Sequence, residues 1–111
     1  MVTPASPRRF DVWLVSLDPT VGSEIAKTRP CVVVSPDAAN KFLRTVLVAP
    51  LTHTPKRYPT RVDSLFQQQS GQVALDQLRA VDTVRLVKRL GTLDEATGRA
   101  VCAVLGEMFA W

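Results

Sequence analysis

The chain has 111 residues, of which 46% are hydrophobic and 22% charged, and its net charge at pH 7 is +4. This length suits a single domain, and the composition is that of a globular chain, which excludes a disordered tail. No stretch approaches the ~20 consecutive apolar residues that span a bilayer, so we expect no membrane association.

The positive charge is concentrated in the middle third of the chain. Residues 27–61 carry seven basic residues against the single acid Asp37, a net charge of +6, whereas residues 1–26 and 62–111 each have a net charge of −1. Such a block favours a polyanionic partner, nucleic acid first. An ordinary solvated surface is the alternative interpretation.

The N-terminal residues lack the features of a secretory signal. No apolar run follows Arg8 and Arg9, because Asp11 interrupts at once. We therefore expect a cytoplasmic protein with a flexible N-terminus at residues 1–8 and one domain at residues 9–111.

Short β-rich runs bounded by turn residues predict strands in the first half of the chain. Residues 11–17 form the first, and residues 29–35 form a second that is apolar on both faces, as a central or barrel strand would be. The segment 20–28 between them has no apolar periodicity and predicts a long loop. Residues 37–43 predict a helical turn.

The next strand is expected at residues 45–51, where Pro50 indicates an edge or a bulge. A loop follows it at residues 52–60. The remaining strands are expected at residues 61–66, 72–75, 78–82 and 84–90, with the glutamine triplet 67–69 at a hairpin tip.

The last segment changes to helical periodicity. Thr92 and Glu95 have the spacing of a capping box, and an apolar stripe of Val101, Val104, Leu105 and Met108 follows. Residues 94–109 should form an amphipathic helix packed on the sheet. The fold class is then mainly β with a C-terminal helix (α+β), a small antiparallel barrel.

Several kinds of catalytic site are absent from the sequence. The single histidine, His53, has no second His or Cys at metal-ligand spacing, and two cysteines cannot form a disulfide framework. No nucleophile elbow and no phosphate-binding glycine motif occurs. We expect neither a metal nor another cofactor.

Polar residues gather in two predicted loops. In the first, Arg29 stands at the root of a buried strand, where a fixed guanidinium suits a phosphate. The alternative is that Arg29 pairs with an acid such as Glu24 or Asp76. In the second loop, His53 is a candidate proton shuttle near neutral pH, although a lone loop histidine is more often merely exposed.

Six stretches of the chain agree in order and spacing with those of one known family: Asp11–Pro19, Gly22–Glu24, Lys27–Pro36, Val46–Thr52, Leu75–Arg79 and Leu90–Asp94. On these stretches the chain resembles the MazF/PemK toxins of bacterial toxin–antitoxin pairs, from about residue 9 to its C-terminus. The resemblance implies a growth-inhibiting endoribonuclease (mRNA interferase) that cuts single-stranded RNA at a short sequence without metal. The implied products are a 2′,3′-cyclic phosphate and a 5′-hydroxyl.

The resemblance also implies a homodimer built on a small barrel of the SH3-like, CcdB/PemK type. The implied partner is a cognate antitoxin whose flexible tail covers the RNA groove. Contact with DNA is expected only through the toxin–antitoxin complex.

The paired Arg and Thr of the family fall on Arg29 and Thr52, and the Ser-Glu of its first loop falls on Ser23 and Glu24. One departure occurs. Some members carry a catalytic Arg two residues before an Asp, and here the Asp is Asp76 but the earlier position is Ala74.

These matches lead to a set of expected roles. Arg29, Thr52 and Glu24 are the predicted catalytic residues, with the general base open among Glu24, His53, Asp76 and water. The predicted RNA-binding residues are Ser23, Lys27, His53, Lys56, Arg57, Asp76 and Gln77, of which Asp76 and Gln77 would contact base edges.

Two other functions stay open at this point. A CcdB-like toxin on the same fold would poison gyrase through C-terminal residues such as Met108–Trp111. A non-catalytic nucleic-acid-binding barrel would need only the basic block.

Overall fold

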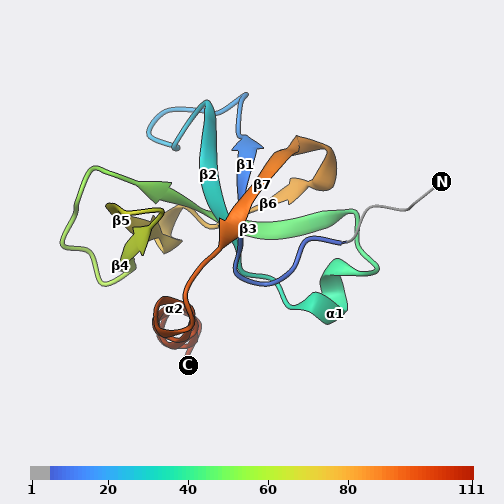
Figure 1. Ribbon diagram of the computed structural model, residues 1–111. Coiled ribbons are helices and arrows are strands. Elements are labelled where there is room, and N and C mark those ends of the chain that lie inside the picture. Colours follow the sequence, from blue (N-terminus) through green and yellow to red (C-terminus); the bar gives the residue numbers. More distant parts are fainter. Residues whose placement is uncertain (1–5) are drawn as a thin grey trace.

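The computed structural model, which describes residues 6–111, is a strongly bent antiparallel sheet with one long helix packed against it (Figure 1). The strands are β1 (Asp11–Ser16), β2 (Thr28–Val33), β3 (Thr45–Thr52), β4 (Arg61–Phe66), β5 (Gln69–Ala74), β6 (Arg79–Asp82) and β7 (Leu86–Thr92). The helical elements are α1 (Asp37–Asn40), the single turns η1 (Leu75–Gln77) and η2 (Thr83–Arg85), and α2 (Glu95–Met108). The predicted class, mainly β with a C-terminal helix, is confirmed. Within residues 6–111, every helix falls short of the length and apolar character needed to cross a membrane.

Strand β3 is the centre of the sheet. The strand order is β4-β5-β3-β2-β1-β7, and β6 pairs with the first half of β3. Pro50 is therefore not on an edge strand, which corrects the prediction. On the side away from β2, β3 pairs with β6 as far as Val48 and with β5 only from Leu51, so Pro50 lies between the two partners, where its missing N–H leaves no ladder bond unmade.

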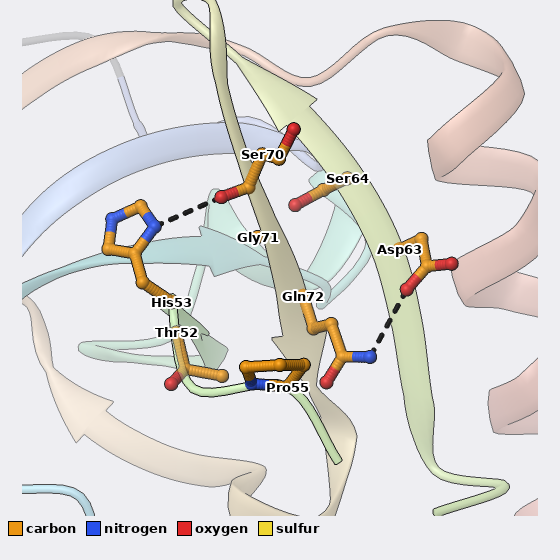
Figure 2. Close-up of a pocket in the computed structure, with 8 residues that line it drawn as sticks. All are labelled: Thr52, His53, Pro55, Asp63, Ser64, Ser70, Gly71 and Gln72. Atoms are coloured by element: carbon orange, nitrogen blue, oxygen red, sulfur yellow. Dashed lines mark hydrogen bonds between the residues drawn. The ribbon is translucent and has the colours of Figure 1, made fainter. Parts of the chain in front are cut away.

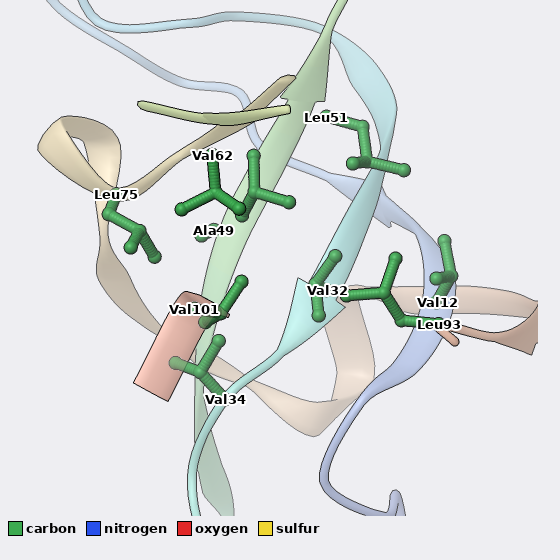
Figure 3. Close-up of a cluster of buried hydrophobic side chains, with 10 residues drawn as sticks. Val12, Val32, Val34, Ala49, Leu51, Val62, Leu75, Leu93 and Val101 are labelled. Atoms are coloured by element: carbon green, nitrogen blue, oxygen red, sulfur yellow. The ribbon is translucent and has the colours of Figure 1, made fainter. Parts of the chain in front are cut away.

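The bend of the sheet gives each face its own apolar core. On the face covered by α2, Val32 of β2 and Val34, which directly follows β2, lie in a cluster with Leu51 and Val101 (Figure 3). On the opposite face, Cys31 and Val33 of β2 lie in a second cluster of buried hydrophobic side chains. This alternation explains the unbroken apolar run of β2, which the sequence predicts to be buried on both faces.

Helix α2 packs as its periodicity predicts but begins differently. Val101 is fully buried in the core. The cap is Asp94, whose carboxylate accepts a hydrogen bond from the Thr97 backbone N–H at 3.0 Å. The predicted capping box is wrong, because Thr92 is still the last residue of β7. Gly98 is required by close packing, since a Cβ there would lie 2.9 Å from the Phe10 ring.

The hairpin between β4 and β5 is tighter than predicted. Only Gln67 and Gln68 form its tip, both with positive φ (49° and 65°), and β5 begins already at Gln69. Part of the predicted flexible N-terminus, residues 1–5, lies outside the described residues. Within the remainder, Arg8 forms an ion pair with Asp37 at 3.2 Å.

Candidate active site

The sheet register brings Arg29 and Thr52 to neighbouring positions. Strands β2 and β3 pair Val33 with Val48 and Cys31 with Pro50. The same register continued by two residues places Arg29 opposite Thr52, the last residue of β3. Side chains directly opposite one another in an antiparallel pair share a face, here the face away from α2.

This row continues across two further strands. Thr52 pairs with Gln72 of β5, and Gln72 pairs with Asp63 of β4. The Gln72 amide nitrogen donates to the Asp63 carboxylate at 3.1 Å. Thr52, Gln72 and Asp63 thus form a polar row over three strands, β3, β5 and β4, and the continued register of β2 aligns Arg29 with the Thr52 end of this row. Gln72 and Asp63 cannot be identified from the sequence alone, because only the strand register shows that they lie in line with Thr52.

The hydrogen bonds of Arg29 and Thr52 leave both residues able to bind an anion. The Arg29 Nε donates to the Ala26 carbonyl at 2.8 Å, and within residues 6–111 its terminal nitrogens have no partner. The expected alternative, an ion pair with Glu24 or Asp76, is wrong. The Thr52 Oγ1 accepts from the Thr54 N–H at 3.2 Å, which leaves the hydroxyl proton free to be donated.

The first loop, predicted at residues 20–28, spans residues 17–27 between β1 and β2 and borders a small hollow of about 220 Å³. Ser23 and Glu24 line this hollow together with Asp76 and Gln77, so the structure brings four predicted site residues together. One carboxylate oxygen of Glu24 accepts from the Val21 N–H at 2.6 Å. Its second oxygen has no hydrogen-bond partner in the described part of the chain.

Asp76 is bound by Arg61, a residue that the sequence alone does not single out. Arg61 donates to both of its carboxylate oxygens, from Nε at 2.7 Å and from Nη2 at 3.2 Å, and the Thr60 hydroxyl donates at 3.1 Å. Partial burial acts to raise the pKa of Asp76, but the hydrogen bonds from Arg61 and Thr60 outweigh it and the pKa is lowered. Arg61 is the cross-strand partner of Ala74, a relation that only the strand pairing reveals.

Asp76 and Gln77 each tie one loop to the turn η1. Arg61, which binds Asp76, also donates to the Thr54 carbonyl of the second loop at 3.4 Å. The Gln77 side-chain oxygen accepts from the Ile25 N–H of the first loop at 3.0 Å. Asp76 and Gln77 are the residues predicted to contact base edges, and in the structure these side-chain oxygens hold the two loops.

His53 follows Thr52 and lines a second hollow, of about 380 Å³ (Figure 2). Its Nδ1 lies 3.1 Å from the Ser70 carbonyl oxygen. Since a carbonyl only accepts, Nδ1 carries the proton, and in the neutral ring Nε2 carries the lone pair. The ring is exposed and anchored at one nitrogen.

The basic block is divided between two places in the fold. Lys27, Lys56 and Arg57 are exposed on the two loops beside the polar row. The Lys56 backbone is fixed by Gln72, which accepts from its N–H at 3.0 Å and donates to its carbonyl at 3.1 Å. Lys41 and Arg44 precede β3 at its other end, so only part of the block faces the candidate site.

The remaining reactive groups do not form a separate catalytic centre. Burial raises the pKa of the Cys31 thiol to about 12, although Arg79 and Arg29 act to lower it, so the thiol is not a nucleophile at neutral pH. Over residues 6–111, no three His, Cys, Asp or Glu side chains gather as metal ligands would.

Comparisons with known proteins identify the family. Residues 8–109 match the family model described as "PemK-like, MazF-like toxin of type II toxin-antitoxin system". The chain is 35% identical over 95 residues to the endoribonuclease MazF of Staphylococcus epidermidis, covering 80% of this chain and 79% of that protein. It is 37% identical over 93 residues to the endoribonuclease PemK of Escherichia coli, covering 78% and 70%.

Solved structures show the same fold. MazF from Deinococcus radiodurans superposes with a TM-score of 0.83 at 26% identity, covering 96% of this chain and 98% of that one. A mycobacterial endoribonuclease in complex with its cognate antitoxin superposes with a TM-score of 0.80 at 24% identity, covering 96% and 99%. The chain therefore belongs to the PemK-like, MazF-like family of toxins of type II toxin–antitoxin systems.

Proposed function

We propose that this toxin is an endoribonuclease that cuts single-stranded RNA at a short sequence, without a metal ion, by attack of a ribose 2′-hydroxyl on the adjacent phosphate. The products are a 2′,3′-cyclic phosphate and a 5′-hydroxyl. The observation that supports this most is the register of β2 and β3, which pairs Cys31 with Pro50; continued by two residues, this register aligns Arg29 with Thr52.

Arg29 and Thr52 act on the charge of the reacting phosphate. The terminal nitrogens of Arg29 donate to the phosphoryl oxygens, which gain negative charge as the fifth bond to phosphorus forms, and the Thr52 hydroxyl donates to one of them. Arg29 is not the general base, because its pKa above about 12 leaves almost none of it neutral. Arg29 lies on β2 and Thr52 on β3, two strands that pair with each other, so the positions of both residues are set before RNA binds.

Glu24 is the best candidate to accept the proton of the 2′-hydroxyl. It lines the hollow beside Pro50 and has one free carboxylate oxygen. Asp76 is a poor candidate, because Arg61 and Thr60 occupy its oxygens and its pKa is lowered. His53 is exposed and presents Nε2, which supports a role in binding RNA or in proton transfer to the leaving 5′-oxygen.

The remaining predicted RNA-binding residues act on the backbone of the substrate. Lys27, Lys56 and Arg57 carry exposed positive charges on the two loops, which supports a sequence-independent, salt-sensitive contribution. Ser23 lies beside Glu24 at the same hollow and can donate to a phosphate or a ribose.

The partners follow from the relatives. Three of the structural neighbours are named as complexes of MazE with MazF, and one as a complex with a cognate antitoxin. We propose that an antitoxin binds this chain too, with a flexible tail over the cleft between the loops, and that DNA is contacted only through that complex. The active unit is proposed to be a homodimer in the cytoplasm.

The alternative functions are less favoured. The family match and the named endoribonucleases among the relatives favour RNA cleavage over gyrase poisoning. A non-catalytic barrel would not need the unpaired guanidinium of Arg29 beside the hydroxyl of Thr52.

The direct test uses purified protein and end-labelled RNA of mixed sequence in EDTA. We expect fragments with cyclic phosphates from the wild type and from Arg99→Ala, a control that removes an exposed arginine on α2. Arg29→Ala and Thr52→Ala should lose this cleavage. Intact RNA with the wild type, together with inhibited gyrase supercoiling, would overturn the proposal in favour of the second function.

A further inference from the structure

Arg61 stands at the start of β4 with its guanidinium almost fully enclosed. Its side chain is only 8% exposed, whereas that of Arg99 on α2 is 78% exposed. Each of its three nitrogens donates a hydrogen bond within the protein, two to Asp76 and one to Thr54. The guanidinium also lies over the Tyr58 ring, 5.3 Å from the ring centroid. Arg61 therefore has a fixed orientation, and it holds other groups instead of presenting free nitrogens to a phosphate.

A chain of hydrogen bonds connects this guanidinium with the hydroxyl of Thr52. Arg61 Nη1 donates to the Thr54 carbonyl at 3.4 Å, and the Thr54 N–H donates to Thr52 Oγ1 at 3.2 Å. The second bond occupies a lone pair of Oγ1, so the hydroxyl proton points away from Thr54 and is available to another acceptor. By holding Thr54, Arg61 keeps the Thr52 hydroxyl in the orientation that donation to a phosphoryl oxygen requires.

The other end of the chain reaches the first loop. Asp76 lies in η1, and both of its carboxylate oxygens accept from Arg61. The next residue, Gln77, accepts from the Ile25 N–H at 3.0 Å, and Ile25 directly follows Glu24. The turn η1 is thus connected by hydrogen bonds to the loop of the proposed general base and, through Arg61, to the loop that follows β3.

The contact between Arg61 and Asp76 has a geometry that another cation does not reproduce. A planar guanidinium donates two hydrogen bonds to one carboxylate and still has an N–H group for a third partner, whereas an ammonium is a point charge without this fork. Partial burial acts to raise the pKa of Asp76, but the hydrogen bonds keep that pKa lowered, so the pair is charged at neutral pH.

We propose that Arg61, through its pair with Asp76, is a positioning residue of the cleavage reaction. It fixes the Thr52 hydroxyl and the loop of Glu24 relative to each other before RNA binds, and it does not touch the substrate. The proposal rests on the proposed function for the reaction that is measured. It assigns Asp76 to the support of the site and not to proton transfer or to base recognition.

The first test separates positioning from binding. kcat and KM are measured on a defined RNA for the wild type, Arg61→Ala and Arg99→Ala, with rates normalised to the folded fraction. Arg61→Ala should lower kcat about 10- to 100-fold, because small misplacements of reacting groups cost about this much. Its KM should stay within about twofold of the wild-type value, since a lost RNA contact would raise KM instead. Arg99→Ala should change neither quantity. An unchanged kcat in Arg61→Ala, or a rise in KM alone, would overturn the proposal.

Two further variants test whether the pair acts as a unit. Arg61→Lys keeps the charge and the long side chain, which guards against loss of folding, and it should still lower kcat because the fork is lost. Asp76→Ala and the double variant with Arg61→Ala should have the same kcat as Arg61→Ala within about threefold. A wild-type kcat in Arg61→Lys would contradict the proposal. So would a double variant whose loss is the product of the two single losses, because Asp76 would then act on RNA by itself.

The last test needs no RNA. Backbone amide order parameters from NMR relaxation are compared for the wild type, Arg61→Ala and Arg99→Ala. The order parameter of the Thr54 amide should be about 0.85 in the wild type and in Arg99→Ala, and it should fall below about 0.6 in Arg61→Ala. An unchanged value in Arg61→Ala would refute the positioning role. A wild type that cuts no RNA would instead refute the proposed function, and the order parameter would still decide whether Arg61 orders the loop.

Discussion

At the end of β3, Leu51 and Thr52 are adjacent in the chain but point to opposite faces of the sheet. Leu51 packs with Val62 and Val73 in the core beneath α2. Thr52 lies in the polar row with Gln72 and Asp63, on the opposite face. The apolar face thus fixes the register, and the register places the polar groups opposite one another.

This comparison explains how a small barrel holds a catalytic site without ion pairs around Arg29. The core face resists movement because its side chains are fully packed. Around Thr52 the opposite face, the loop face, is polar, and the two loops beside it are tied to η1 by Asp76 and Gln77. Substitutions on the two faces should therefore have different consequences.

The largest effect is expected from Arg29→Ala on the loop face. Loss of one charge-stabilising group should reduce the cleavage rate about 100- to 1,000-fold. The melting temperature should change little, because the side chain of Arg29 makes only one hydrogen bond within residues 6–111. Initial rates on a defined RNA and thermal unfolding measure the two quantities, and Arg99→Ala serves as the control. Equal losses of rate and stability would contradict the division between the faces.

The opposite result is expected from Val101→Ala on the core face. Val101 of α2 is fully buried against the sheet, so its truncation should lower the free energy of unfolding by about 2 kcal/mol. Cleavage per folded molecule should stay within about twofold of the wild type. Urea denaturation and rates normalised to the folded fraction would reveal a catalytic role for the core face if both fell together.

Arg61→Ala should sharpen the comparison, because Arg61 joins a loop to the sheet. Its side chain is only 8% exposed, so loss of the pair with Asp76 should lower the free energy of unfolding by about 1 to 2 kcal/mol. Loss of the exposed pair in Arg99→Ala should lower it by less than about 0.5 kcal/mol. Urea denaturation of both variants tests this, and equal effects would show that the Arg61 contact is unimportant.

The same pair predicts a dependence of stability on pH. The folded pKa of Asp76 is lowered, so its ionised form stabilises the fold above the unfolded pKa of about 3.9, and this stabilisation is lost as the pH falls through the lower folded value. Between about pH 5 and pH 2 the wild type should therefore lose more stability than Arg61→Ala. Parallel curves for the two proteins would contradict this assignment.

The smallest effect is expected from Gly106→Ala on α2. The glycine is exposed and nothing lies within 4 Å of a Cβ there, so the substitution should raise the free energy of unfolding by about 0.5 to 1 kcal/mol. Cleavage should not change. Urea denaturation measures the gain, and a loss of stability would show that the glycine has a packing role.

The fold could be predicted from the sequence further than the site could. Alternating and continuous apolar runs indicate the strands and α2, because each face of the sheet buries its own set of side chains. The predicted capping box is wrong because Thr92 and Asp94 are both residue types that cap helices, and only the length of β7 decides which of them is the N-cap.

The site depends on contacts between strands distant in the chain. Arg29 and Thr52 could be named from the family resemblance, but their juxtaposition is a matter of register. Arg61 and Gln72 could not be found from sequence, because their roles arise from the pairing of β4 with β5 and of β5 with β3.

The central claim is that Arg29 and Thr52 hold one phosphodiester together. A crystal structure of the protein with a short RNA, made uncleavable by a 2′-deoxy nucleotide at the cut site, tests it most directly. The account predicts a single phosphate whose oxygens accept hydrogen bonds from the Arg29 guanidinium and from the Thr52 hydroxyl. An RNA bound with no phosphate in contact with both residues would contradict it.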